Sequence, residues 1–129
     1  MIREIIFRGK RIDNSEWIEG SYIHLNVNAD FICQGRSFNS LIPIKIEVIP
    51  ETVGQYTGLT VPSGKIFEHD IVTAKFKSNG ARFNFVVKYS NKMGCYVFDN
   101  GCTQSLFGEI RSVRIIGNIH DNPELIKEV

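Results

Sequence analysis

Apolar and polar residues alternate along short stretches of this chain, and turn-forming residues separate the stretches at close intervals. In the clearest case, Ile44, Ile46 and Val48 alternate with Lys45 and Glu47. Successive side chains of a strand point to opposite faces of a sheet, so this pattern predicts a half-buried strand. Many such short segments, divided by Gly, Asn, Asp and Pro, predict a mainly β fold.

The same reasoning predicts several further elements. More strands are expected at 5–8, 17–25, 72–88 (as a hairpin), 95–98 and 113–119. Gly20 is expected to mark a bulge, and the less regular stretch 26–42 is expected to be a strand followed by a loop. Proline suits the first position of a helix, so short helical turns are expected at 50–53 and 122–125.

Composition supports one small β-rich domain. The chain has 129 residues, nine of them Phe, and its net charge is +1. A chain of this length can bury a core without metal or disulfides. There are three cysteines, at 33, 95 and 102, an odd number that does not suggest a set of disulfides. The N-terminal residues do not have the pattern of a signal peptide, and no apolar run is long enough to span a membrane. Reduced thiols and a cytoplasmic location are therefore expected.

Asn79-Gly80, with alternating apolar residues on both sides, predicts a β-hairpin with a two-residue loop. Lys77 would then lie opposite Arg82, and Phe76 opposite Phe83. One face of the hairpin would be apolar, formed by Val72, Ala74, Phe76, Phe83, Phe85 and Val87. The other face would be basic.

The basic residues of this region suggest a candidate nucleic-acid-binding site. They are Lys75, Lys77, Arg82, Lys88 and Lys92, and no acidic residue lies between Ile71 and Phe98. A two-stranded ribbon fits the major groove of DNA, and several cations on it would bind phosphates in a salt-sensitive way. The favoured alternative is a solvated face whose lysines keep an exposed hairpin from pairing with other chains.

The remaining reactive residues predict no catalytic or metal site. His24, His69 and His120 lie in separate segments, and the spacing of Cys95 and Cys102 is too long for a zinc knuckle. A composite site from distant segments stays open. In a strand, His69 would point away from its two acidic neighbours, so the three side chains could not act together on one substrate. Asp70 is expected instead to accept backbone N–H bonds from the preceding turn, at a strand start on the surface. No cofactor is expected.

Four segments resemble the YopX family of phage and prophage proteins. They are 3–10 (REIIFRGK), 50–59 (PETVGQYTGL), 63–72 (SGKIFEHDIV) and 116–125 (IGNIHDNPEL), in the family's order. The family usually has glycine where this chain has His69. The resemblance implies a small, β-rich, phage-associated protein with no activity to carry over. By analogy, residues 51–129 are expected to form an SH3-like barrel and 1–50 an N-terminal β extension, within a single domain covering 1–129.

Two functional hypotheses follow. The first is a non-enzymatic accessory protein that binds a host protein or copies of itself through loops and edge strands. The alternative is a nucleic-acid-binding module that uses the basic hairpin at 72–88. A membrane partner is not expected. An enzyme would need a pocket that joins distant segments, such as His24 or His120 with Asp70 or Asp121.

Overall fold

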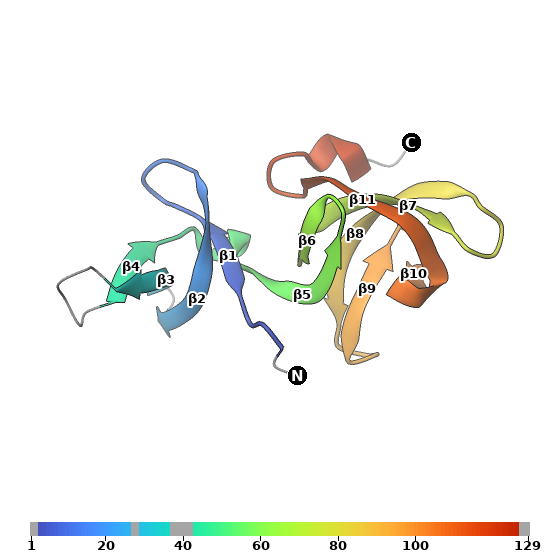
Figure 1. The fold of residues 1–129 in the computed structure, drawn as a ribbon. Helices are drawn as coiled ribbons and strands as arrows, with labels where there is room; N and C mark the ends of the chain where they lie inside the picture. Colours follow the sequence, from blue (N-terminus) through green and yellow to red (C-terminus); the bar gives the residue numbers. More distant parts are fainter. Residues whose placement is uncertain (1–2, 27–28, 37–42, 127–129) are drawn as a thin grey trace. The chain divides into compact units, whose positions relative to one another are not determined.

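A computed structural model describes residues 3–26, 29–36 and 43–126. Its strands form two antiparallel sheets, so the prediction of a mainly β fold is confirmed (Figure 1). The chain divides into two compact units, Met1–Tyr56 and Thr57–Val129. The placement of one unit relative to the other is not determined, so each is described separately.

The first unit is an antiparallel meander. Its elements are β1 (Phe7–Lys10), β2 (Trp17–Asn26), β3 (Ala29–Arg36), β4 (Pro43–Glu47) and the 3₁₀ turn η1 (Pro50–Thr52). Each of these strands pairs with the next one in sequence, and the first residues of β5 (Gly54–Val61) pair with β1. The predicted strands and the predicted turn at 50–53 are therefore present. Part of the loop expected within 26–42 falls on 27–28 and 37–42, outside the described residues.

Gly20 lies where two strands approach closely. A Cβ atom added there would lie 2.2 Å from the carbonyl oxygen of Cys33 on β3. Gly20 pairs regularly with Phe7, so the expected bulge at this position is wrong. Glycine is required because the neighbouring backbone leaves no room for a side chain.

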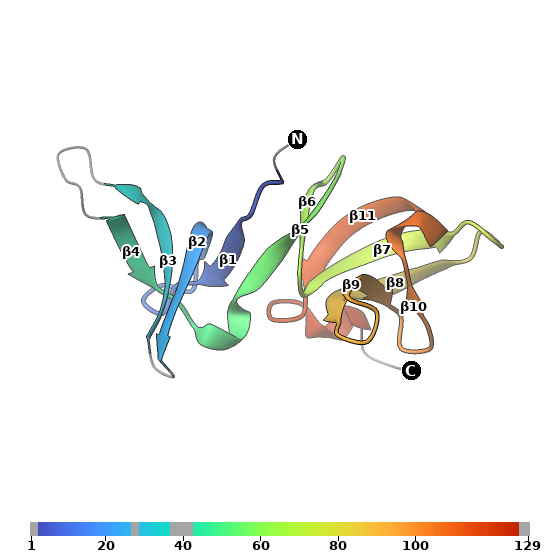
Figure 2. The same ribbon diagram turned by 90° about the horizontal axis from the view of Figure 1, so that it is seen from below.

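The second unit contains the larger share of the core. Its elements are the rest of β5, then β6 (Gly64–Phe67), β7 (Asp70–Phe76), β8 (Arg82–Ser90), β9 (Cys95–Asp99), β10 (Gln104–Ser105), η2 (Phe107–Glu109), β11 (Ile110–Asn118) and η3 (Pro123–Ile126). Five of these strands form a sheet in the order β10-β9-β8-β7-β11. Figure 2 shows β11 running alongside β7, with β8 on the other side of β7. The helical turn expected at 122–125 is present as η3.

One face of the five-stranded sheet covers a buried cluster. Its members are Ile66, Val72, Ala74, Phe85, Val87, Phe98 and Ile110. The predicted apolar face is thus confirmed for most of its members. Phe83 differs because it lies at the rim and is 45% exposed.

Within the described part of the chain, the hydrogen-bonded ladders leave both sheets open. The first has the order β4-β3-β2-β1-β5-β6, and the five-stranded sheet ends at β10 and β11. No ladder joins these ends into a closed barrel, so the SH3-like comparison stays a prediction. The three helical segments in this part are short 3₁₀ turns, of which η2 was not expected. None of them is long and apolar enough to cross a membrane.

Candidate functional site

The hairpin between β7 and β8 turns where predicted, but its loop is longer. Lys75 lies opposite Arg82, and Ala74 lies opposite Phe83. The predicted pairing of Lys77 with Arg82 is therefore wrong by two residues. The backbone explains the difference: Gly80 N–H donates to the carbonyl of Phe76 at 2.8 Å, and Gly80 has a φ of 72°. These contacts make a wider turn over 77–81, where the left-handed conformation falls on glycine.

A shift of two residues keeps every side chain on its predicted face, because the strand period is two. Lys75 and Arg82 still lie together on the face opposite the core. Phe76 and Phe83 still contact each other, with ring centroids 5.5 Å apart. The division into an apolar face and a basic face is confirmed.

The hairpin lies within the sheet and is not a free two-stranded arm. β8 pairs with β7 and β9, and β7 also pairs with β11. The lysines of these strands therefore do not protect an exposed edge. The sequence predicted either a free two-stranded ribbon or an exposed hairpin protected by its lysines. Both predictions are wrong about exposure, because each strand of the hairpin has a neighbour on both sides.

The neighbouring strand β11 adds two cations that the sequence interpretation missed. Arg111 lies opposite Lys75, and Arg114 lies opposite Thr73. Three residues apart, the two arginines would face opposite ways in a regular strand. The register shifts between them, and Ser112 has a φ of 55°. This bulge places both arginines on the outer face.

Arg111, Lys75 and Arg82, which we call the basic row, lie side by side on three adjacent strands. The guanidinium of Arg82 donates to the Thr73 hydroxyl at 3.2 Å. The Arg111 guanidinium lies over the hairpin turn, 3.8 Å from the position that a Cβ atom would take at Gly80. Like charges placed directly opposite each other destabilise a sheet by a few tenths of a kcal/mol per pair. An anion bound across the row would remove this repulsion.

The other three predicted cations have different surroundings. Lys77 lies in the β7–β8 turn, and Lys92 lies in the turn between β8 and β9. Lys88 is on the outer face, but its ammonium is 2.9 Å from the Asp99 carboxylate. The structure thus brings Lys75 and Arg82 together and separates Lys77 and Lys92 from that pair.

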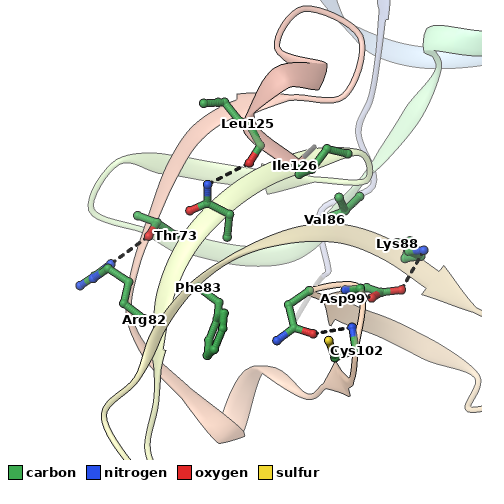
Figure 3. A pocket seen from close by; sticks show the side chains of 12 residues that line it. Thr73, Arg82, Phe83, Val86, Lys88, Asp99, Cys102, Leu125 and Ile126 are labelled. Carbon is green, nitrogen blue, oxygen red and sulfur yellow. Dashed lines mark hydrogen bonds and ion pairs between the residues drawn. The ribbon is translucent and has the colours of Figure 1, made fainter. Parts of the chain in front are cut away.

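A groove adjoins the basic row on the outer face of the same sheet (Figure 3). It holds about 620 Å³ and is lined by β7 and β8, by the segment 99–102 and by the end of η3 at Leu125 and Ile126. Arg82 belongs to both the row and the groove. Asn84, from the groove floor, donates to the Leu125 carbonyl at 2.9 Å and holds η3 against the sheet.

The Lys88–Asp99 ion pair forms one wall of this groove. Burial would raise the pKa of Asp99, but the Lys88 ammonium and the Gly101 N–H, at 2.7 Å, together lower the pKa below its usual value. Asp99 therefore remains a carboxylate at neutral pH and offsets the charge of Lys88. The cations left to meet a ligand are Arg82 in the groove and its neighbours in the basic row.

The first unit contains a separate polar cluster around Asp30. The Asp30 carboxylate is 98% buried and accepts a hydrogen bond from the Tyr22 hydroxyl at 2.5 Å; Nδ1 of His24 is also 2.5 Å away. Burial and the hydrogen bond to Asp30 raise the pKa of Tyr22 to about 12. Hydrogen bonds from Tyr22 and His24 lower the pKa of Asp30. The cluster ties β2 to β3.

His69 and His120 meet in the second unit, although 51 residues separate them in sequence. His69 lies in the turn before β7 with a φ of 77°, so the expectation that it belongs to a strand is wrong. This left-handed conformation is one that glycine adopts most readily. Asp70 accepts from the N–H of Phe67 at 2.7 Å, as predicted, but is buried and not at the surface.

The groove and the basic row carry different groups. The groove combines one arginine, amide groups and apolar side chains, and the basic row presents three cations in a line. Among the described residues, no group of three or more His, Cys, Asp or Glu side chains could hold a metal ion. The fold and this site define a small antiparallel β protein with a basic outer face.

The comparisons with known proteins give the family. The family model described as YopX protein matches residues 6–127. The chain therefore belongs to the YopX family, and the resemblance found in its four sequence segments is confirmed. No curated protein and no solved structure matches the chain.

Proposed function

We propose that this protein is a phage-type accessory protein that binds nucleic acid, without catalysis, through the basic outer face of its five-stranded sheet. Membership of the YopX family supports the phage-type part. One observation carries the binding part: Arg111, Lys75 and Arg82 are held directly beside one another on three paired strands. Phosphate contacts from such a face fix position on a nucleic acid without reading its sequence.

The experiment replaces the basic row by neutral side chains of similar length, as the triple variant K75Q/R82Q/R111Q. A matched control, R3Q/K45Q/K65Q, removes the same charge from exposed positions outside the candidate site. Binding of single-stranded and double-stranded DNA and RNA is measured by fluorescence anisotropy at ~50 mM salt. The row variant is expected to lose most of the affinity, and the control to lose little.

Stability separates loss of binding from loss of fold. Removing the like charges relieves repulsion, so the row variant is expected to unfold at the same or a slightly higher denaturant concentration than the wild type. Absence of binding by the wild-type protein to every nucleic acid at low salt would contradict the proposal. Equal losses in the row variant and the control would show that only net charge matters.

A second candidate is protein binding or self-assembly, which the open sheets favour. Both sheets end in edge strands, and such edges bind extended segments of a partner. Light scattering over a range of concentrations tests self-assembly. A protein that stays monomeric at every concentration and captures no host protein would remove this candidate.

A further inference from the structure

His69 and His120 are held in place by their backbones. His69 N–H donates to the carbonyl of Val87 at 2.7 Å, and the His69 carbonyl accepts from Ile119 at 3.0 Å. His120 N–H donates to the side-chain oxygen of Asn118 at 3.0 Å. The two imidazoles therefore start from fixed Cα positions, on the turn before β7 and just after β11.

The distance between the rings is that of two ligands on one metal ion. Nε2 of His120 lies 3.4 Å from Nδ1 of His69, and the ring planes are 81° apart. Without a metal this contact is a weak N–H···N hydrogen bond, longer than the ~2.7–3.2 Å usual for N–H···O bonds. Two nitrogens bound tetrahedrally to zinc, each about 2.0–2.1 Å from it, are ~3.3–3.4 Å apart. We propose that His69 and His120 form a two-histidine site for a divalent transition metal such as Zn²⁺.

The surroundings of His69 suit a metal ligand. Glu68 places a carboxylate oxygen 4.0 Å from Nε2 of His69, on the side of the ring away from His120. This separation is too long for a hydrogen bond, but the negative charge favours a proton on Nε2, which leaves the lone pair on Nδ1. The His69 side chain is 26% exposed, so an ion can reach it from solvent.

The backbone of His69 supplies an independent argument. A non-glycine residue with a φ of 77° is strained, and strain of this kind gathers at functional sites. Glycine would satisfy the turn without strain, so the imidazole is present at a local cost in stability. With two protein ligands, the other positions of the metal are left to water, and binding is expected to be reversible.

The test measures the thermal midpoint of the full chain with and without ~1 mM Zn²⁺, and the visible spectrum with Co²⁺. Two variants, H69G and H120Q, each remove one ligand. H69G also relieves the strain, so it is expected to fold at least as well as the wild type. H24Q is the matched control, because it removes a histidine from the other unit.

Zinc is expected to raise the midpoint of the wild type and of H24Q by a few degrees, as binding to the native state requires. The visible absorption of Co²⁺ is expected to change on binding to those two proteins. Neither effect is expected in H69G or H120Q. An absent shift in the wild type, or one retained in H69G or H120Q, would overturn the proposal; the latter would place the metal on a thiol or on His24.

Discussion

His69 combines a strained backbone with a side chain that contacts another element. Left-handed backbone costs an ordinary residue ~1–2 kcal/mol, and glycine adopts it freely. Glycine at position 69 would also give the unfolded chain more conformational freedom, which favours unfolding by ~0.5–1 kcal/mol. This offsets part of the stability gained by removing the backbone strain. His69 is thus one residue at which local stability and a possible ligand role oppose each other.

The variant H69G is therefore expected to raise the free energy of unfolding by about 0.5–1 kcal/mol. Urea denaturation followed by circular dichroism measures it. H120Q removes the ring contact but keeps the backbone of His69, so it should show no such gain. A less stable H69G would mean that contacts of the His69 side chain exceed the strain.

Tyr22 supplies a pH-dependent prediction. Its pKa is raised to about 12 by burial and by the hydrogen bond to Asp30. The phenol keeps its proton in the folded state, so this contribution to stability is complete below the ordinary pKa of ~10 and is lost as the pH rises through about 12. Absorption of phenolate should show a tyrosine that ionises late, near pH 12.

Two variants identify that tyrosine. Y22F should remove the late component, and D30N should move it toward lower pH, because the carboxylate that disfavours phenolate is gone.

Asp30 behaves in the opposite sense: its lowered pKa gives stability that is present above about pH 4 and is lost as the pH falls through the lowered pKa. A titration in which Y22F and wild type coincide would contradict the role of this cluster.

At the scale of elements, β2 and β3 depend on the missing side chain of Gly20. In G20A, the new methyl group would lie 2.2 Å from the Cys33 carbonyl, so one strand must move. The expected loss of stability is about 2–3 kcal/mol, the upper range for overpacking. The control G108A, at a glycine with nothing within 4 Å, should change stability by less than ~0.5 kcal/mol. Equal losses of stability in G20A and G108A would contradict the close approach of the Cys33 carbonyl to Gly20.

The same scale shows what the sequence could predict. Alternation identified most strands and the two faces of the β7–β8 hairpin, because the period of two survives an error in register. It could not predict the loop at 77–81, since Asn79-Gly80 fits both a two-residue loop and the wider turn that forms. It also could not place Arg111 and Arg114 on one face, because a bulge interrupts the alternation between them.

Long-range contacts limited the prediction of the site. Lys75 and Arg82 were identified because they are close in sequence on one hairpin. Arg111 reaches the same row only through the pairing of β11 with β7, and no local pattern indicates which strand lies there. The His69–His120 contact depends on the same pairing, which brings 69 and 119 together.

At the scale of the whole molecule, the charge distribution matters more than the net charge of +1. If three or four of the cations Lys75, Arg82, Arg111 and Arg114 contact phosphates, binding to duplex DNA should weaken steeply with salt. The slope of log K against log salt is expected to be about −3. Anisotropy titrations between ~50 and ~200 mM salt measure it, and a slope near zero would exclude phosphate contacts by the basic row.

The position of β7 has a consequence for the motions of the second unit. Because β7 is paired with β8 on one side and β11 on the other, and residues 70–74 are buried, no small opening exposes its backbone. Its amide protons should be among the last to be replaced by deuterium, and their exchange should report complete unfolding of this unit. The strand that carries Lys75 would then be a rigid support, on which incoming phosphates meet charges already in place.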